Sequence, residues 1–103
     1  MAHDVEASVR RNRWSVTSQG SFLWENWDED EFVVYSTASG DTHLINGVTA
    51  EVLRQLERRD LEFSQLVLNL AESFGAELDQ QTESYVARLL VHLDEIGLVD
   101  AVP

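Results

Sequence analysis

The fold is decided by the stretch Phe22-Leu23-Trp24-Glu25-Asn26-Trp27-Asp28-Glu29-Asp30-Glu31-Phe32-Val33-Val34-Tyr35. Its two ends are rich in the aromatic and β-branched residues that favour strands, and an acidic break separates them. We therefore predict two strands, joined by a turn at Asp28-Glu29-Asp30.

A third strand is predicted at Thr42-His43-Leu44-Ile45, after a turn that gathers small and polar residues around Gly40. Short loops place strands that are neighbours in sequence beside each other in a sheet. The three segments therefore form a meander, and the third strand lies at an edge unless it packs beside the first.

Three helices follow in the sequence. Asn46 caps the first, which carries Val48, Val52, Leu53 and Leu56 at helical spacing. The second carries one apolar stripe from Phe63 to Phe74 and stops at Gly75. The third starts near Asp79 and ends at Gly97, with Leu98 folding back on Leu93.

The order of strands followed by helices predicts an α+β fold that is winged-helix-like, with an N-terminal three-stranded antiparallel sheet followed by three helices. Residues 1–13 lack periodic hydrophobicity and predict a flexible N-terminal arm. Residues 14–103 then form a single domain, because 103 residues suffice for one core.

The charge of the chain is strongly one-sided. Nineteen acidic residues face seven arginines, with no lysine, for a net charge of −12. Such a surface repels nucleic acid, whose affinity depends on basic residues that neutralise phosphates. The basic residues Arg10, Arg11 and Arg13 lie on the predicted arm, where we expect them to be solvated; contact with nucleic acid or an acidic partner is the alternative.

Several classes of protein are excluded by residues that the chain lacks. It has no cysteine, which removes disulfides, thiolate nucleophiles and the usual zinc spacings. No apolar run approaches the roughly 20 residues that cross a bilayer, and no signal-peptide pattern opens the chain. We expect a cytoplasmic protein that binds no membrane.

We also expect no catalytic residues, metal or cofactor. His43 and His92 lack a metal-ligand spacing, so we expect His43 to hydrogen-bond locally within its strand. The acidic turn at Asp28-Glu29-Asp30-Glu31 lacks the spacing and glycine of a calcium loop. Nothing supplies a base or an oxyanion hole near Ser39.

The chain resembles the PqqD-like peptide chaperones, a RiPP recognition element type, and is most similar to the branch of the HPr-rel-A system. Three segments carry the resemblance, which covers roughly residues 14–99: the stretch from Trp24 to Tyr35, the run Ser39-Gly40-Asp41-Thr42-His43-Leu44-Ile45-Asn46, and Ala50-Glu51-Val52-Leu53. Gly47 departs from the proline that this branch often has at the start of its first helix.

The resemblance implies a non-catalytic chaperone of natural-product biosynthesis. Such a domain captures a ribosomal precursor or leader peptide by β-strand addition and presents it to a modifying enzyme or kinase-like protein of the same cluster. By position, the peptide adds beside the third strand and lies against the last helix. The implied strand residues are Thr42, His43, Leu44, Ile45 and Asn46.

The residues themselves support the same binding mode. An edge strand presents free N–H and C=O groups to a peptide backbone. On the last helix, Arg88 and His92 share a face beside Tyr85 and Leu89, which gives an apolar floor with one permanent positive charge. These four residues complete the candidate peptide site.

Two alternatives remain open, and so do the roles of single residues. The helices are also typical of a winged-helix DNA-binding regulator, although Arg88 alone neutralises few phosphates. An exposed edge could instead pair with a second copy in a homodimeric protein–protein adaptor. Arg88 could also pair with Glu83 or Glu95, and Trp14, Trp24 and Trp27 are either core residues or binding anchors.

Overall fold

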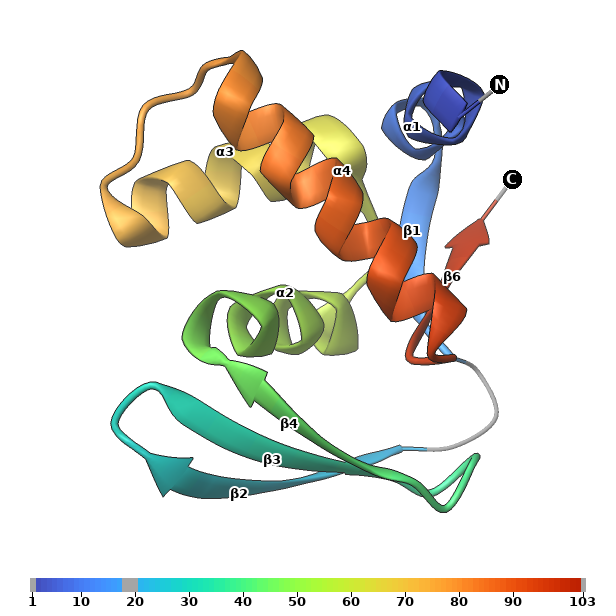
Figure 1. Ribbon diagram of the computed structural model, residues 1–103, viewed down its shortest axis with the longest axis vertical. Helices are drawn as coiled ribbons and strands as arrows, with labels where there is room; N and C mark the ends of the chain where they lie inside the picture. The colour runs from blue at the N-terminus through green and yellow to red at the C-terminus, as the bar shows by residue number, and fades with distance from the viewer. Residues whose placement is uncertain (1, 18–20, 103) are drawn as a thin grey trace.

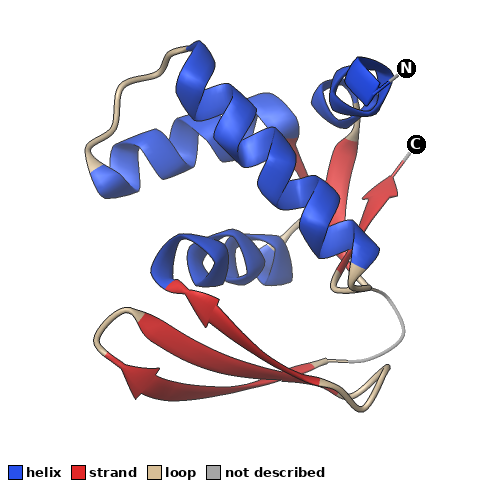
Figure 2. Ribbon diagram, viewed as in Figure 1, coloured by secondary structure: helices blue, strands red, loops and turns tan. Residues whose placement is uncertain are grey.

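The protein has a mixed α+β fold. The computed structural model describes residues 2–17 and 21–102, and the side chains of residues 2–6 are not described. Over these residues it has four helices and six strands, which form two small antiparallel sheets (Figures 1 and 2). Met1 and Pro103, at the ends of the predicted arm and domain, lie outside the described residues.

The first sheet contains β2 (Phe22–Asp28), β3 (Glu31–Ser36) and β4 (Thr42–Asn46), the three segments with the strongest strand pattern. They pair antiparallel in the order β2-β3-β4. Trp24 lies opposite Val34, and Val34 lies opposite His43. The register shifts between Asn26 and Asp28, next to the acidic turn.

Side chains alternate between the two faces of this sheet. The inner face turns toward the helices and buries Phe22, Val34 and Ile45. The outer face leaves Leu23 and Leu44 exposed. All four helices lie on the inner side of the sheet (Figure 1).

Helix α2 (Gly47–Arg58) begins directly where β4 ends. The side chain of Asn46 accepts a hydrogen bond from the backbone N–H of Thr49 at 2.9 Å, which confirms the predicted cap. A Cβ at Gly47 would come within 2.5 Å of Asp30 Oδ1, so the turn between β2 and β3 closes over the start of the helix. A side chain at Gly47 would therefore require the exposed Asp30 side chain to move.

Arg54 on α2 contacts two aromatic rings of the β2-β3-β4 sheet. The guanidinium of Arg54 lies 4.7 Å from the ring centre of Trp24 and 5.1 Å from that of Phe32. Trp24 Nε1 also donates a hydrogen bond to Glu57 Oε1 at 3.1 Å. One turn of α2 thus joins two strands through contacts between cation and ring.

We expect Arg54→Ala to lower the free energy of unfolding by about 1 kcal/mol, because it removes two cation–π contacts and the packing of the arginine stem. Urea unfolding at neutral pH measures the change. Arg88→Ala is the matched control, since Arg88 is exposed and has no hydrogen bond or ion pair among the described residues. Equal losses in both variants would contradict this role for Arg54.

Helices α3 (Phe63–Phe74) and α4 (Gln80–Glu95) match the predicted second and third helices. Gly75 adopts φ +65° at the end of α3, as its place after the apolar stripe predicts. After α4, the N–H of Gly97 binds the carbonyl of Asp94 at 3.1 Å, and the N–H of Leu98 binds that of Leu93 at 2.9 Å. This is the predicted Schellman ending, and it turns the chain back toward the core.

A second sheet joins three short strands that the sequence analysis does not predict. They are β1 (Arg13–Val16), β5 (Leu61–Glu62) and β6 (Val99–Val102), paired in the order β5-β1-β6. Strands of two to four residues show no periodicity, and their partners lie far away in the sequence.

The N-terminal segment also differs from the prediction of a flexible arm over residues 1–13. Ala2–Arg11 form helix α1, Val9 is buried, and Trp14 Nε1 donates a hydrogen bond to the Val9 carbonyl at 3.1 Å. Of the three arginines expected to be solvated, Arg10 instead contacts α4 and the Phe63 ring. Arg13 pairs with Glu62 but stays exposed, and Arg11 is exposed as expected. The Trp14 ring thus contacts α1, and α1 itself packs mainly against α4 and α3.

The core lies between the helices and the inner faces of the two sheets. Its largest fully buried side chains include Trp14, Leu53, Leu66, Leu90 and Leu93. These residues lie on β1, α2, α3 and α4, so the core joins segments that are far apart in the sequence. No helix among the described residues is long and apolar enough to cross a membrane.

Candidate functional site

A groove lies between the edge strand β4 and the C-terminal half of α4. Its volume is about 470 Å³. The groove is lined by Thr42, His43, Leu44, Ile45, Asn46, Thr49, His92, Leu93 and Ile96. The structure therefore brings all five predicted strand residues together with His92 from the predicted helix.

One wall of this groove is an unpaired strand edge. β4 pairs with β3 along one side, and no described residue pairs with its other side. Alternate N–H and C=O groups of an edge strand point away from its neighbour. β4 therefore offers backbone hydrogen bonds to another extended chain.

His43 lies on the inner face of β4, opposite the fully buried Val34. Its Nε2 atom is buried and has no hydrogen-bond partner, which corrects the expectation of a local hydrogen bond. Burying such a group without a partner costs about 1–3 kcal/mol. A residue that lines the groove therefore carries a buried polar atom that the described residues leave without a partner.

The other predicted helix residues lie elsewhere on α4. Arg88 lines a separate hollow with Gln80, Gln81, Ser84 and Tyr85. Leu89 is half-buried and packs against the core. Arg88 has no ion-pair partner among the described residues, and Glu83, one of its two predicted partners, binds Arg10 instead.

A smaller apolar pocket of about 240 Å³ lies beside the N-terminal half of α4. Val48, the second residue of α2, lines it together with Tyr85 and the end of α3, where Phe74 is half exposed. Because Val48 follows the strand β4 by two residues, the pocket lies near the end of the groove. Tyr85 borders both this pocket and the hollow beside Arg88.

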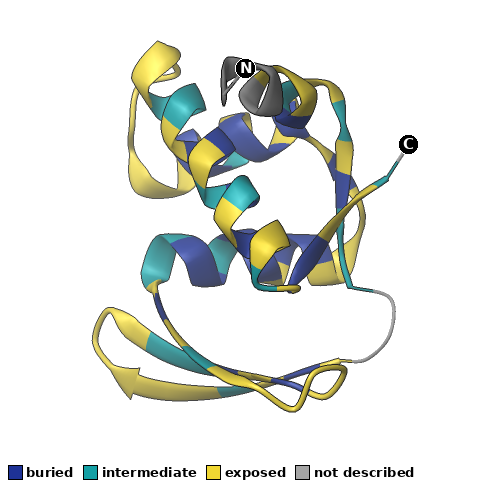
Figure 3. Cartoon of the chain, turned by 45° about the vertical axis from the view of Figure 1, so that its right-hand side comes forward, coloured by how far each residue is buried: buried dark blue, intermediate teal, exposed yellow. Residues whose placement is uncertain are grey.

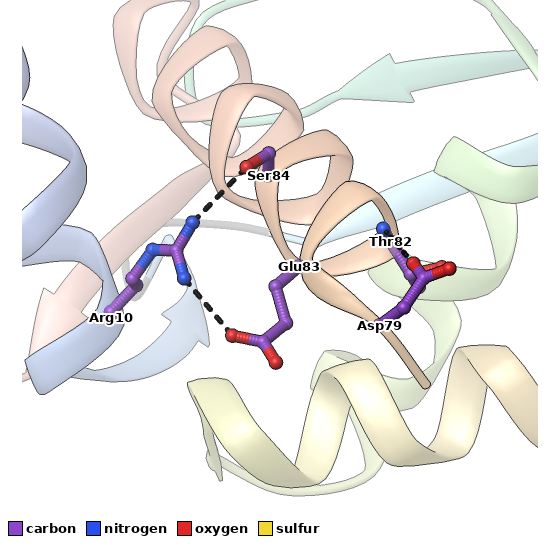
Figure 4. Close-up of polar contacts among 5 residues, drawn as sticks. All are labelled: Arg10, Asp79, Thr82, Glu83 and Ser84. Carbon is purple, nitrogen blue, oxygen red and sulfur yellow. Dashed lines mark hydrogen bonds and ion pairs between the residues drawn. The ribbon is translucent and has the colours of Figure 1, made fainter. Parts of the chain in front are cut away.

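Three hydrogen bonds lie at the N-terminal end of helix α4, the second wall of the groove (Figure 4). Asp79 caps the helix by accepting from the N–H of Thr82 at 2.9 Å. Arg10 reaches across from α1 to Glu83 Oε1 at 3.0 Å and to Ser84 Oγ at 3.2 Å. Helix α1 thus stabilises the position of α4, which forms one wall of the groove.

Two carboxyl groups at opposite ends of α4 have pKa values shifted in opposite directions. The hydrogen bond from the Thr82 backbone lowers the pKa of Asp79 below its usual 3.8. Burial, with smaller contributions from Asp100 and Glu95, raises the pKa of Asp94 above 3.8. Ionised Asp79 therefore stabilises the folded protein, and ionised Asp94 destabilises it.

These shifts predict opposite stability changes. At neutral pH, Asp79→Ala lowers the melting temperature and Asp94→Asn raises it. The Asp79 contribution is fully present above pH 3.8 and is lost as the pH falls through the lower pKa of the folded state. The Asp94 penalty disappears below pH 3.8, where that carboxyl is neutral in both states.

Thermal unfolding of both variants at neutral pH and at a pH below these pKa values measures the two effects. Both differences from the unaltered protein should shrink in acid, although loss of the Asp79 side chain still removes its neutral hydrogen bond. A gain from Asp94→Asn that persists in acid would show that the gain does not come from charge.

Four residues that the structure adds to the candidate site were not predicted. Thr49, Leu93 and Ile96 line the groove, and Val48 lines the apolar pocket. For Val48 and Thr49 a signal was present, because a strand that runs directly into a helix places the first turn of that helix beside the strand end. The three tryptophans differ in burial. Trp14 lies in the core, Trp24 is half-buried against Arg54, and Trp27 is 67% exposed.

The remaining polar cluster lies between α2 and α3, in a hollow of about 510 Å³. Gln55 donates to Glu51 and accepts from Asn69, so these groups satisfy one another. Within residues 7–17 and 21–102, whose side chains are described, no group of three or more His, Asp or Glu side chains is placed to hold a metal ion. Comparison of the chain with protein-family models, with curated proteins and with solved structures found no match.

Proposed function

We propose that the protein is a non-catalytic peptide-binding chaperone of winged-helix-like type, which captures a precursor or leader peptide by strand addition along β4. The observation that supports this most is the buried, unpartnered Nε2 of His43 inside a groove walled by a free strand edge. An extended peptide supplies what both features lack: a continuous row of backbone donors and acceptors.

The groove suits a peptide chain better than a small molecule. Its wall is five residues of extended backbone, which matches the repeat of a strand more closely than the compact shape of a metabolite. The apolar pocket beside Val48 and Tyr85 then receives an apolar side chain of the same peptide. The peptide would be delivered to a modifying enzyme or a kinase-like protein.

The net charge of −12 supports a peptide with basic flanking residues. It argues against the winged-helix DNA regulator, because the exposed surface of α4 carries few basic groups for a phosphate backbone. The same net charge also opposes pairing of β4 with a second copy of the chain, because two acidic chains repel each other.

The direct test is a titration of isotopically labelled protein with short peptides encoded by reading frames beside its gene. We expect amide shifts along Thr42–Asn46 and along the His92 face of α4. Shifts confined to other elements would overturn the site, and failure of all these peptides to bind would overturn the function.

N-methylation of the bound peptide tests strand addition itself. In an extended peptide, every second N–H points toward β4 and the others point away. Methylation of one alternating set should abolish binding, while methylation of the other set should leave affinity within about twofold. Equal sensitivity of both sets would contradict pairing with β4.

A further inference from the structure

The outer face of the β2-β3-β4 sheet carries a continuous apolar patch, which consists of Leu23, Val33, Tyr35 and Leu44. Leu23 lies directly opposite Tyr35, and Val33 lies directly opposite Leu44. Val33 and Tyr35 are two residues apart on β3 and share this face. The four side chains therefore cross all three strands without interruption.

This patch is open to solvent. Leu23 is 59% exposed, Leu44 is 58% exposed and Tyr35 is 37% exposed. The helices lie on the opposite side of the sheet, and no described segment covers the outer face (Figures 1 and 3). Contiguous apolar surface of this kind on a soluble domain marks a contact with another molecule.

The border of the patch is strongly acidic. Residues 21–47 contain six Asp and Glu residues and no Lys or Arg. Glu25 lies on the same face, opposite Val33, and the turn from Asp28 to Glu31 ends the hairpin. A second copy of the chain or an anionic lipid surface would meet this border with charge of the same sign.

We infer that the outer face docks a partner protein that presents apolar side chains bordered by Lys or Arg. The apolar patch supplies the buried centre of the interface, and the acidic border supplies charge complementarity and faster association. Leu23 and Tyr35 lie outside the peptide groove, whereas Leu44 borders both the groove and the outer face. One strand thus serves two surfaces, and a peptide on its edge leaves the outer face free.

The test uses a displayed library of random peptides, selected against the full chain carrying His92→Trp, which fills the groove. We expect selected binders to be enriched in Lys or Arg together with large apolar residues. Their affinity should fall at least about tenfold for the double variant Leu23→Ser/Tyr35→Ser, which leaves the groove-lining residues unchanged, and should weaken as salt is added.

Leu78→Ser is the matched control. Leu78 is 58% exposed, close to the 59% of Leu23, but it lies between α3 and α4. The control should bind the selected peptides with unchanged affinity. Equal loss in the control, binders without basic enrichment, or a library that yields no binder dependent on Leu23 and Tyr35 would each overturn the inference.

Two further measurements separate this surface from other occupants and from the peptide groove. Analytical ultracentrifugation should find a monomer; a dimer abolished by Leu23→Ser/Tyr35→Ser would assign the face to self-association instead. Binding to phosphatidylserine vesicles through the same residues would assign it to a membrane. The double serine variant should still bind groove peptides, so failure of either proposal leaves the other testable.

Discussion

Trp14→Ala is expected to lower the free energy of unfolding by about 3–5 kcal/mol, which is a large share of the roughly 5–15 kcal/mol that stabilises a domain. Trp14 is 2% exposed, and it lies on the central strand of the second sheet. Truncation leaves a cavity between α1 and that sheet, and it leaves the Val9 carbonyl without its indole donor. The melting temperature should fall by more than about 10 °C.

Two variants identify the source of this loss. Trp14→Phe keeps most of the ring volume and removes the hydrogen bond from Nε1, so it should cost about 1 kcal/mol. Trp27→Ala removes the same side chain at a position that is 67% exposed, and it should change stability by less than about 0.5 kcal/mol. Similar losses for Trp14→Ala and Trp27→Ala would contradict the packing of α1 on Trp14.

The N-terminal helix was not predicted from sequence because its stability depends on contacts with distant parts of the chain. Helix α1 has only ten residues, and isolated helices of this length are marginal in water. Its stability comes from contacts with distant partners, such as Arg10 with Glu83 and Ser84 on α4. No local pattern around Arg10 reports a contact that lies 73 residues away.

Elements with strong local patterns lie where the sequence predicts them. The apolar stripe from Phe63 to Phe74 gives α3, and the caps at Asn46 and Asp79 begin α2 and α4. Each of these signals acts within about one or two turns of the chain. β1, β5 and β6 lack such signals, because their pairing partners are brought together only by the complete fold.

The predicted site residues also separate into those that meet in the groove and those that lie elsewhere. The strand residues and His92 meet in one groove because β4 is a regular edge strand and α4 crosses beside it. Arg88 lies four residues before His92, yet it borders another hollow. Helical spacing fixes which residues share a face, but the crossing of helix and strand decides which part of that face meets the groove.

His92→Trp should therefore reduce the affinity of a groove peptide by about tenfold to a hundredfold, which corresponds to about 1.4–2.8 kcal/mol of binding free energy. His92 is exposed on α4 and lines the groove opposite β4. An indole at this position occupies the space that a peptide backbone needs beside the strand. Because the residue is exposed, folding stability should change by less than about 0.5 kcal/mol.

Arg88→Trp supplies the matched control for this variant. It places the same side chain on the same helix, one turn earlier, in the hollow formed with Gln80, Gln81 and Ser84. If strand addition along β4 carries the affinity, isothermal titration should give Arg88→Trp an affinity within about twofold of the unaltered protein. The opposite ranking, with Arg88→Trp the weaker binder, would move the peptide from the β4 edge to the N-terminal half of α4.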